Sequence, residues 1–205
     1  MDEKIDAEVR TSLSGRIGWQ RIARRIRVPM GFVFAAVFLW LARPGWRSLA
    51  ASLALVVPGL WLRGYAAGYV KKNAELTTTG PYAYTRNPLY LGSMLIALGF
   101  AAASWNWIIL VVLAALFTAI YVPTIQSEEA YLRMHFSEFD TYARKVPRLV
   151  PRLTAASVAG RPPGARSGGF SRTLYLKHRE YNALVGSCAI YLALALKLAF
   201  LQRFF

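Results

Sequence analysis

Two polar clusters, separated by an apolar run, hold the side chains best suited to chemistry. The first, residues 80–92, reads GPYAYTRNPLYLG, and the second, residues 126–129, reads QSEE. Polar groups at the end of an apolar run are expensive to desolvate without a partner, so their concentration there indicates a site. The two clusters are therefore the candidate functional site.

The first cluster combines a helix start with an arginine and aromatic hydroxyls. Asn87 precedes Pro88, so it should be extended, and Pro88 should begin a helix with free N–H groups. Arg86 adds a guanidinium suited to a carboxylate or phosphate. Flat rings with hydroxyls, suited to an adenine, a sulfonium or a lipid headgroup, come from Tyr82, Tyr84 and Tyr90. The alternative, which composition alone favours, is an interfacial aromatic belt with a membrane-flanking arginine.

The second cluster supplies two carboxylates. If the apolar run folds as a helical hairpin, its two ends meet, and Glu128 and Glu129 face the first cluster. Adjacent helical residues diverge by about 100°, so one of the pair should point inward. It can accept hydrogen bonds from hydroxyl or amino groups, or offset a cation. The alternative is a solvated helical face or an ion pair with Arg86.

Composition indicates an integral membrane protein. The 205 residues are 56% hydrophobic and carry a formal charge of +15. Because the basic residues flank apolar runs, membrane topology explains the charge better than nucleic acid does. One cysteine, Cys188, permits no disulfide framework, and two histidines predict no zinc or iron site. The N-terminus does not resemble a cleavable signal peptide.

Apolar segments predict an all-α integral membrane bundle of about five transmembrane helices. They cover residues 28–42, 48–70, 89–104, 105–122 and 183–201. Glycines in the second segment predict close helix packing. The third and fourth are separated only by residues 104–107, which predicts a tight interfacial hairpin, and Pro123 should bend or end the fourth helix.

Loops rich in Lys and Arg stay cytoplasmic, which places the N-terminus and both polar clusters on the cytoplasmic side, in the plasma or inner membrane if the source is bacterial. Four regions are expected. They are a basic amphipathic interfacial segment at 1–27, a membrane core at 28–152, a flexible linker and interfacial segment at 153–182, and a C-terminal transmembrane helix at 183–205. The alternative for the first is a solvated basic tail.

The motifs resemble the isoprenylcysteine carboxyl methyltransferase family, and the related phospholipid N-methyltransferases share much of the pattern. The resemblance rests on the 80–92 turn, on Glu128-Glu129 followed by Leu132, on Tyr142 and on residues 146–148, VPR. It implies an S-adenosylmethionine-dependent methyltransferase, releasing S-adenosylhomocysteine, with a membrane-embedded helical core and a cytoplasmic-side cofactor pocket. The chain has no Gly-rich strand-to-helix turn of the Rossmann kind.

The resemblance also implies roles for single residues. Cofactor contacts would come from Ala74, Glu75, Leu76, Thr77, Tyr82, Asn87, Pro88, Leu89, Tyr90 and Glu128. The catalytic group would comprise Glu128 as the inward carboxylate, its neighbour Glu129, and Arg86, which braces the turn or the cofactor carboxylate. Arg148 would close a cytoplasmic lid.

Three positions depart from the family pattern. Asn87 replaces a histidine, so it can orient a ligand but cannot carry a proton. Thr124 stands where isoprenylcysteine enzymes place an arginine for the substrate carboxylate, which disfavours that substrate. His135 precedes Phe136-Ser137 where Phe-Gly is usual, and a solvated helix-face histidine is its ordinary interpretation.

The sequence therefore predicts methylation of a lipophilic acceptor at the cytoplasmic interface. Isoprenylcysteine-like carboxylates, phospholipid amines and small hydrophobic thiols or acids stay open as acceptors, with membrane lipids as partners and no nucleic acid. Two alternatives remain. One is an NADPH-dependent reductase of the membrane sterol type, and the other is a non-catalytic basic membrane scaffold. Arg179-Glu180-Tyr181 should anchor the last helix or cover the site, with anchoring favoured.

Overall fold

The computed structural model describes residues 33–71, 75–156 and 169–204, which fall into two compact units, 1–41 and 42–205. In the first unit, residues 33–41 are helical. The expected interfacial segment at 1–27, Ala74 and residues 157–168 lie outside the described residues, so the predictions made for them stay untested.

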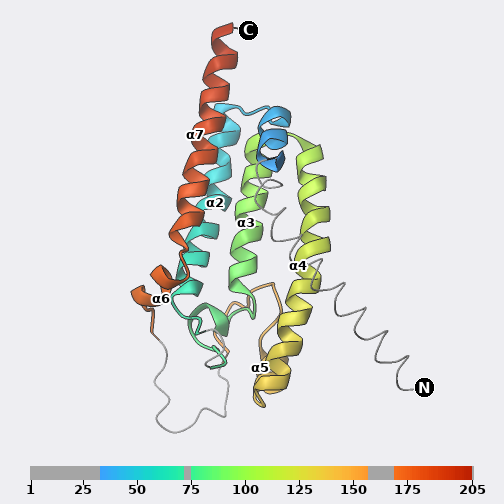
Figure 1. Cartoon of the computed structure of the whole chain (residues 1–205), viewed down its shortest axis with the longest axis vertical. Helices are drawn as coiled ribbons and strands as arrows, with labels where there is room; N and C mark the ends of the chain where they lie inside the picture. The colour runs from blue at the N-terminus through green and yellow to red at the C-terminus, as the bar shows by residue number, and fades with distance from the viewer. Residues whose placement is uncertain (1–32, 72–74, 157–168, 205) are drawn as a thin grey trace, which may run out of the picture. The chain divides into compact units, whose positions relative to one another are not determined.

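All regular elements in the described part of the second unit are helices, with no strand (Figure 1). Its elements are α2 (Trp46–Ala67), the 3-10 turn η1 (Gly80–Ala83), α3 (Pro88–Ser104), α4 (Trp107–His135), α5 (Phe139–Lys145), α6 (Arg172–Lys177) and α7 (Tyr181–Phe204). The prediction of an all-α fold is confirmed. Pro88 occupies the first turn of α3 as expected, since its missing N–H needs no partner there.

Three helices among the described residues are long and apolar enough to cross a membrane, namely α2, α4 and α7. The third predicted span forms α3, which is apolar but has only 17 residues. The described part of the first predicted span covers only residues 33–42, of which 33–41 are helical. The expected number of about five spans is therefore not confirmed.

Glycines bring α2 and α3 into close antiparallel contact. A Cβ added to Gly59 would lie 2.8 Å from the carbonyl oxygen of Gly92, and one added to Gly92 would lie 2.8 Å from the carbonyl oxygen of Gly59. Gly99 packs in the same way against Val56. Small residues let helix backbones approach, as the sequence predicted for the second span.

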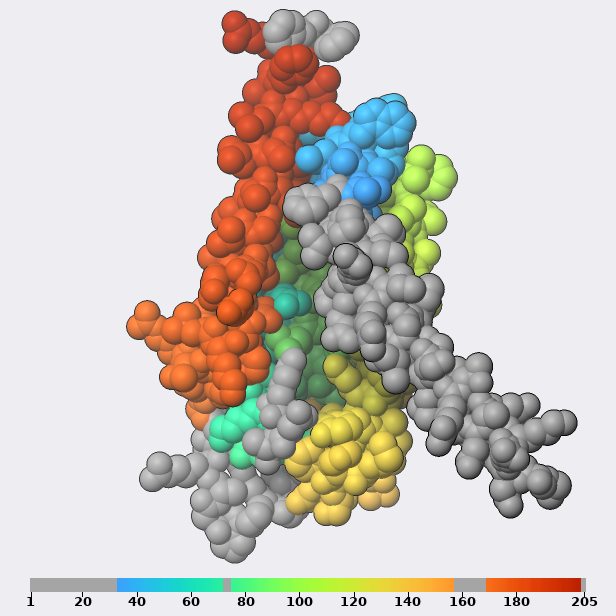
Figure 2. Space-filling view, viewed as in Figure 1, coloured from blue at the N-terminus to red at the C-terminus, as the bar shows by residue number. Residues whose placement is uncertain are grey.

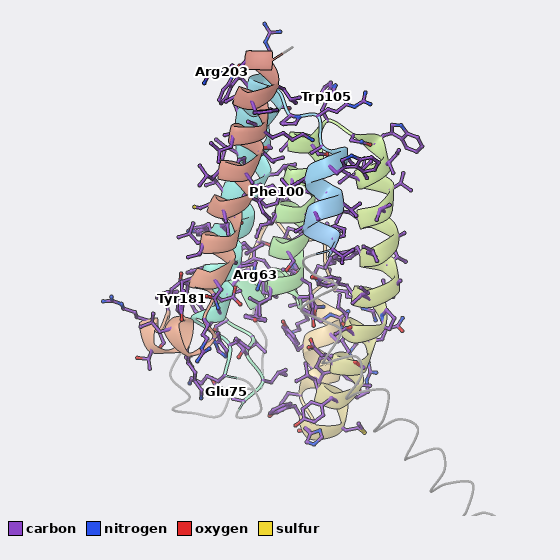
Figure 3. The ribbon with its side chains drawn as sticks, turned by 45° about the horizontal axis from the view of Figure 1, so that its top comes forward. Arg63, Glu75, Phe100, Trp105, Tyr181 and Arg203 are labelled. Carbon is purple, nitrogen blue, oxygen red and sulfur yellow. The ribbon has the colours of Figure 1, made fainter. Side chains whose placement is uncertain are left out.

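The last helix, α7, runs antiparallel along α2 (Figure 1). Near one end the Trp46 Nε1–H donates to Gln202 at 3.2 Å, and further along Ser52 and Tyr191 share a hydrogen bond of 2.7 Å. These contacts attach α7 to the core along much of its length. Figure 3 shows Trp105 and Arg203 at the end of the helices opposite to Glu75.

The predicted tight hairpin between α3 and α4 is present. Trp105 ends α3 in a left-handed conformation (φ 48°), and the Asn106 side chain caps α4 by accepting a hydrogen bond from the Ile108 N–H at 2.9 Å. α4 then continues through Pro123 to His135, so it does not end at the proline. The two glutamates consequently lie on α4 itself, on its extension beyond the apolar stretch.

Candidate functional site

The two polar clusters meet at one end of the helices, as the hairpin predicts. The 80–92 turn leads into α3, and the glutamates lie near the end of α4 that packs beside it. In the space-filling view, the yellow α4–α5 segment and the blue-green segment before α3 lie at the same end as α6 (Figure 2). The predicted convergence of the clusters is therefore confirmed, whereas the chemical roles of their residues stay predictions.

Backbone hydrogen bonds fix the turn to the segment that follows α5. The Arg86 N–H donates to the Pro147 carbonyl at 2.9 Å, and the Asn87 Nδ2 donates to the Arg148 carbonyl at 2.8 Å. The Thr85 hydroxyl donates to the Leu149 carbonyl at 3.0 Å. The Asn87 side chain thus donates a hydrogen bond within the protein, which positions the backbone of Arg148.

A small apolar core supports the same turn from below. It consists of Phe139, Tyr142 and Val146, and the Tyr142 hydroxyl donates to the Tyr82 carbonyl at 2.8 Å. Burial raises the pKa of Tyr142 above its ordinary value, and Arg86 opposes the shift. Tyr82 is also buried, and burial raises its pKa, with Tyr142, Glu128 and Glu180 nearby adding to the rise.

Glu129 is the buried member of the glutamate pair, with 7% of its side chain exposed. Its Oε1 lies 3.1 Å from Arg86 Nη1, and its Oε2 lies 2.8 Å from Arg148 Nη2. The bond to Glu129 raises the pKa of Arg148 above its ordinary value. The Nε of Arg86 is buried and has no hydrogen-bond partner in the described part of the chain. One carboxylate therefore joins α4, the 80–92 turn and the segment after α5.

Glu128 is exposed, and its Oε1 accepts a hydrogen bond from the Tyr90 hydroxyl at 2.9 Å. The Tyr90 ring also packs edge-on against Tyr121 at a centroid distance of 5.2 Å. The prediction that Glu128 is the inward carboxylate is wrong as to burial, because the helix turns Glu129 toward the arginines. Its position beside Tyr90 leaves the Glu128 carboxylate accessible to a ligand.

The other predicted cofactor residues have different surroundings. Glu75 is exposed and pairs with Lys71 at 3.0 Å, whereas Leu76 packs against the Phe139 cluster. Thr77 and Pro88 are buried, and the Leu89 carbonyl accepts a hydrogen bond from Ser93. Ala74 lies outside the described residues. Within the described part of the 72–92 segment, the contacts with the two glutamates come from Arg86 and Tyr90.

Two departures from the family pattern also have clear positions. His135 is exposed, stacks on Tyr131 at 3.9 Å and bonds to the Tyr131 carbonyl at 2.8 Å, so it is a helix-end histidine. The Thr124 hydroxyl donates to the Ile120 carbonyl within α4. Neither side chain takes the place of the histidine that the family pattern has at the position of Asn87.

Sequence reasoning missed a second network built on Arg63. This side chain forks onto Glu180 (Nε–Oε2 2.9 Å, Nη2–Oε1 3.0 Å) and also donates to the Ser93 hydroxyl. Figure 3 shows Arg63 beside α3, at the end of α2 where Tyr181 begins α7. The signal that could have revealed this network is the presence of an arginine, Arg63, within an apolar span. The network favours the predicted anchoring role of residues 179–181.

Each network borders a cavity. The first cavity, about 360 Å³, is polar and is lined by Arg86, Glu129, Arg133, Asp140, Ala143, Arg144 and Arg148. The second, about 590 Å³, is mainly apolar and is lined by Val57, Leu60, Trp61, Gly64, Tyr65, Phe170, Tyr175, Glu180 and Leu184. Across 33–71, 75–156 and 169–204, no group of three or more His, Cys, Asp or Glu side chains is placed to hold a metal ion.

Comparison with known proteins finds a match to a family of known proteins over the region that contains Arg86 and Glu129. The profile of the phospholipid methyltransferase family matches residues 45–138, from the start of α2 to the end of α4. The match covers less than half of the chain, and we call residues 45–138 the methyltransferase-family region because of it. This methyltransferase-family region contains the whole 80–92 turn and both glutamates, while Arg148 and Glu180 lie beyond it.

Three curated proteins are similar to the chain. The nickel-cobalt-cadmium resistance protein NccN of Alcaligenes xylosoxydans xylosoxydans is 39% identical over 95 residues, 46% of this chain and 44% of that protein. The cobalt-zinc-cadmium resistance protein CzcN of Cupriavidus metallidurans is 40% identical over 106 residues, which are 52% of this chain and 48% of that protein. The protein-S-isoprenylcysteine O-methyltransferase of Schizosaccharomyces pombe is 28% identical over 151 residues, which are 69% of this chain and 62% of that protein.

The chain spans about half the length of the two resistance proteins that it matches. No solved structure matches it. The comparisons therefore support the resemblance of residues 45–138 to membrane methyltransferases that the sequence motifs indicated.

Proposed function

We propose that the protein is an S-adenosylmethionine-dependent methyltransferase that acts on a lipophilic acceptor at the cytoplasmic face of a membrane. The observation that carries this proposal is the position of Tyr90 and Glu128 within the methyltransferase-family region, hydrogen-bonded to each other across α3 and α4. The similarity to an isoprenylcysteine O-methyltransferase over 151 residues supports it.

The available donors and acceptors fit the cofactor. S-adenosylmethionine offers ribose hydroxyls and an amino group, which match an exposed carboxylate such as that of Glu128. Tyr90 fixes the orientation of this carboxylate by donating to one of its oxygens. When bound, the cofactor supplies an electrophilic methyl group on a sulfonium.

The remaining site residues position the pocket. Arg86, Glu129 and Arg148 hold the 80–92 turn against the segment after α5, and Asn87 adds a hydrogen bond to the same segment. Orientation of the reacting groups is the main requirement for such a transfer. Because Glu129 is already bonded to two guanidinium groups, Glu128 is the better acceptor for a proton if the substrate is an amine.

The acceptor class follows from the surroundings. Among the described residues, three helices are long and apolar enough to cross a membrane, so a lipophilic acceptor would approach through the bilayer, while the polar cofactor enters from the aqueous side. Thr124 offers no cation for a prenylcysteine carboxylate, which leaves phospholipid amines and small hydrophobic thiols or acids as the favoured acceptors.

Methyl transfer from radiolabelled S-adenosylmethionine into a membrane lipid extract tests the proposal. The purified protein should label an extractable lipophilic product, and Glu128→Gln should lower the rate at least about tenfold. Glu138→Gln, an exposed carboxylate at the start of α5, is the matched control and should retain the rate. Absence of label in any lipid fraction, together with no cofactor binding, would contradict the proposal.

A further inference from the structure

Four arginine side chains converge on the polar cavity at the end of α4. The cavity has a volume of about 360 Å³, and its charged lining residues are Arg86, Arg133, Arg144, Arg148, Glu129 and Asp140. Four guanidinium groups thus face two carboxylates, so the lining carries two positive charges in excess. Arg133, Arg144 and Arg148 are exposed, so water screens part of this charge, but the excess of positive groups around one cavity favours the binding of an anion.

Both carboxylates are already engaged with arginines of the cavity. Glu129 is shared between Arg86 and Arg148. Asp140 accepts from the Arg133 Nε at 2.8 Å, and the Arg133 guanidinium lies over the Phe139 ring, 5.5 Å from its centroid. These contacts hold the guanidinium groups in place but leave the excess charge uncompensated.

We propose that this cavity binds a phosphate-type oxyanion, either free phosphate or the phosphate of an anionic lipid headgroup. Guanidinium groups present paired N–H donors that match the oxygens of a phosphate, and several of them together favour a doubly charged anion. The cavity lies beyond the apolar stretch of α4, where a dissolved phosphate and a lipid headgroup can both reach it.

The cavity shares Arg86, Glu129 and Arg148 with the network that positions the proposed cofactor site, but Tyr90 and Glu128 do not line it. Arg133, whose partner is Asp140, and Arg144 take no part in that network's bonds to the 80–92 turn, so the test variant below changes only these two residues. Binding of an anion here needs neither the cofactor nor an acceptor. The proposal therefore stands or falls independently of the proposed enzymatic activity.

Calorimetry on the full chain in phosphatidylcholine nanodiscs tests the site with inorganic phosphate. A second measurement follows binding to vesicles in which phosphatidic acid replaces part of the phosphatidylcholine. The test variant is R133Q/R144Q, which should weaken binding about tenfold or more. The control, R172Q/K177Q, removes the same charge from exposed positions on α6 and should bind as the unmodified chain does.

A variant that is expected to bind the anion more tightly distinguishes a specific loss of binding from a loss caused by unfolding. Asp140→Asn removes a carboxylate from the cavity and should tighten anion binding about fivefold. All variants are compared by their unfolding midpoints without ligand. A gain in affinity cannot result from loss of the fold.

The outcomes separate the two sources of the phosphate group. Saturable binding of inorganic phosphate that R133Q/R144Q loses supports a free anion. Binding to phosphatidic acid vesicles that the same variant loses, without binding of phosphate, supports a lipid headgroup. Equal binding by R133Q/R144Q and R172Q/K177Q, or no saturable anion binding, would overturn the proposal. Displacement of the anion by S-adenosylhomocysteine would also overturn it, because the cavity would then belong to the cofactor pocket.

Discussion

The Glu129 and Glu180 carboxylates both pair with arginine side chains at the same end of the helices, but they connect different parts of the chain. Glu129 joins α4 to the 80–92 turn and to Arg148 beside a polar cavity. Glu180 joins the start of α7 to Arg63 on α2, beside an apolar cavity. The same ion-pair chemistry thus shapes the candidate site in one network and attaches a helix in the other.

The two networks also differ in their relation to the methyltransferase-family region. Arg86 and Glu129 both lie within residues 45–138, whereas Glu180 lies beyond them. The part of the first network formed by Arg86 and Glu129 thus lies in the matched region, and Arg148 adds to it from outside. The second attaches a segment outside the matched region, so its loss should affect the stability of α7 more than the chemistry.

The largest expected effect is that of Glu129→Gln. Removing this buried carboxylate leaves the largely buried Arg86 guanidinium without its partner and also frees the half-exposed Arg148, which should cost about 3 kcal/mol. Denaturant titration of the protein in detergent micelles measures the change. The control is Asp140→Asn, whose pair with Arg133 is more than half exposed, and it should cost under about 1 kcal/mol. Equal costs would contradict a special role for the first network.

The next effect concerns the close approach of α2 and α3, which lets Arg63 reach Ser93. Gly59→Ala would place a methyl group 2.8 Å from a backbone oxygen of α3, so the helices must separate, at a cost of about 2 kcal/mol. Gly186→Ala on α7 has open space around it and should leave the unfolding midpoint unchanged or raise it. A neutral Gly59→Ala would show that this contact does not limit the packing.

A smaller effect is expected from the second network. Arg63→Gln leaves the Glu180 side chain, which is 11% exposed, without its cation and should cost about 2 kcal/mol or less. The double variant Arg63→Gln/Glu180→Gln should recover part of that cost, and a double-mutant cycle measures the coupling. If each single change abolished methyl transfer at unchanged stability, the assignment of this network to helix attachment would be wrong.

The smallest effect at neutral pH concerns Tyr142. Burial raises the pKa of Tyr142 in the folded protein, so its contribution to stability is complete below the unfolded pKa of about 10 and is lost as pH rises above it. Tyr142→Phe removes the hydrogen bond to Tyr82, at a cost of about 1 kcal/mol. Unfolding followed between pH 8 and about 11 should decline more steeply for the unmodified chain than for the variant.

The sequence predicted the helical hairpin and the meeting of the two clusters, because Pro88 and the 104–107 turn leave few alternatives for the chain. It did not predict which glutamate is buried, since that depends on the rotation of α4 relative to Arg86. The Arg63–Glu180 pair was missed because it joins residues 117 positions apart, which no local pattern links. The number of about five membrane spans is not confirmed, because the run at 89–104 folds as a helix of only 17 residues and the run at 28–42 is described only from residue 33.

The most direct test of the central claim is calorimetric titration of S-adenosylhomocysteine into the unmodified protein, Glu128→Gln and Glu138→Gln. The account predicts saturable binding by the unmodified chain and by Glu138→Gln, and binding at least about tenfold weaker for Glu128→Gln at an unchanged unfolding midpoint. No binding by the unmodified protein, or equal binding by all three, would contradict a cofactor pocket at Tyr90 and Glu128.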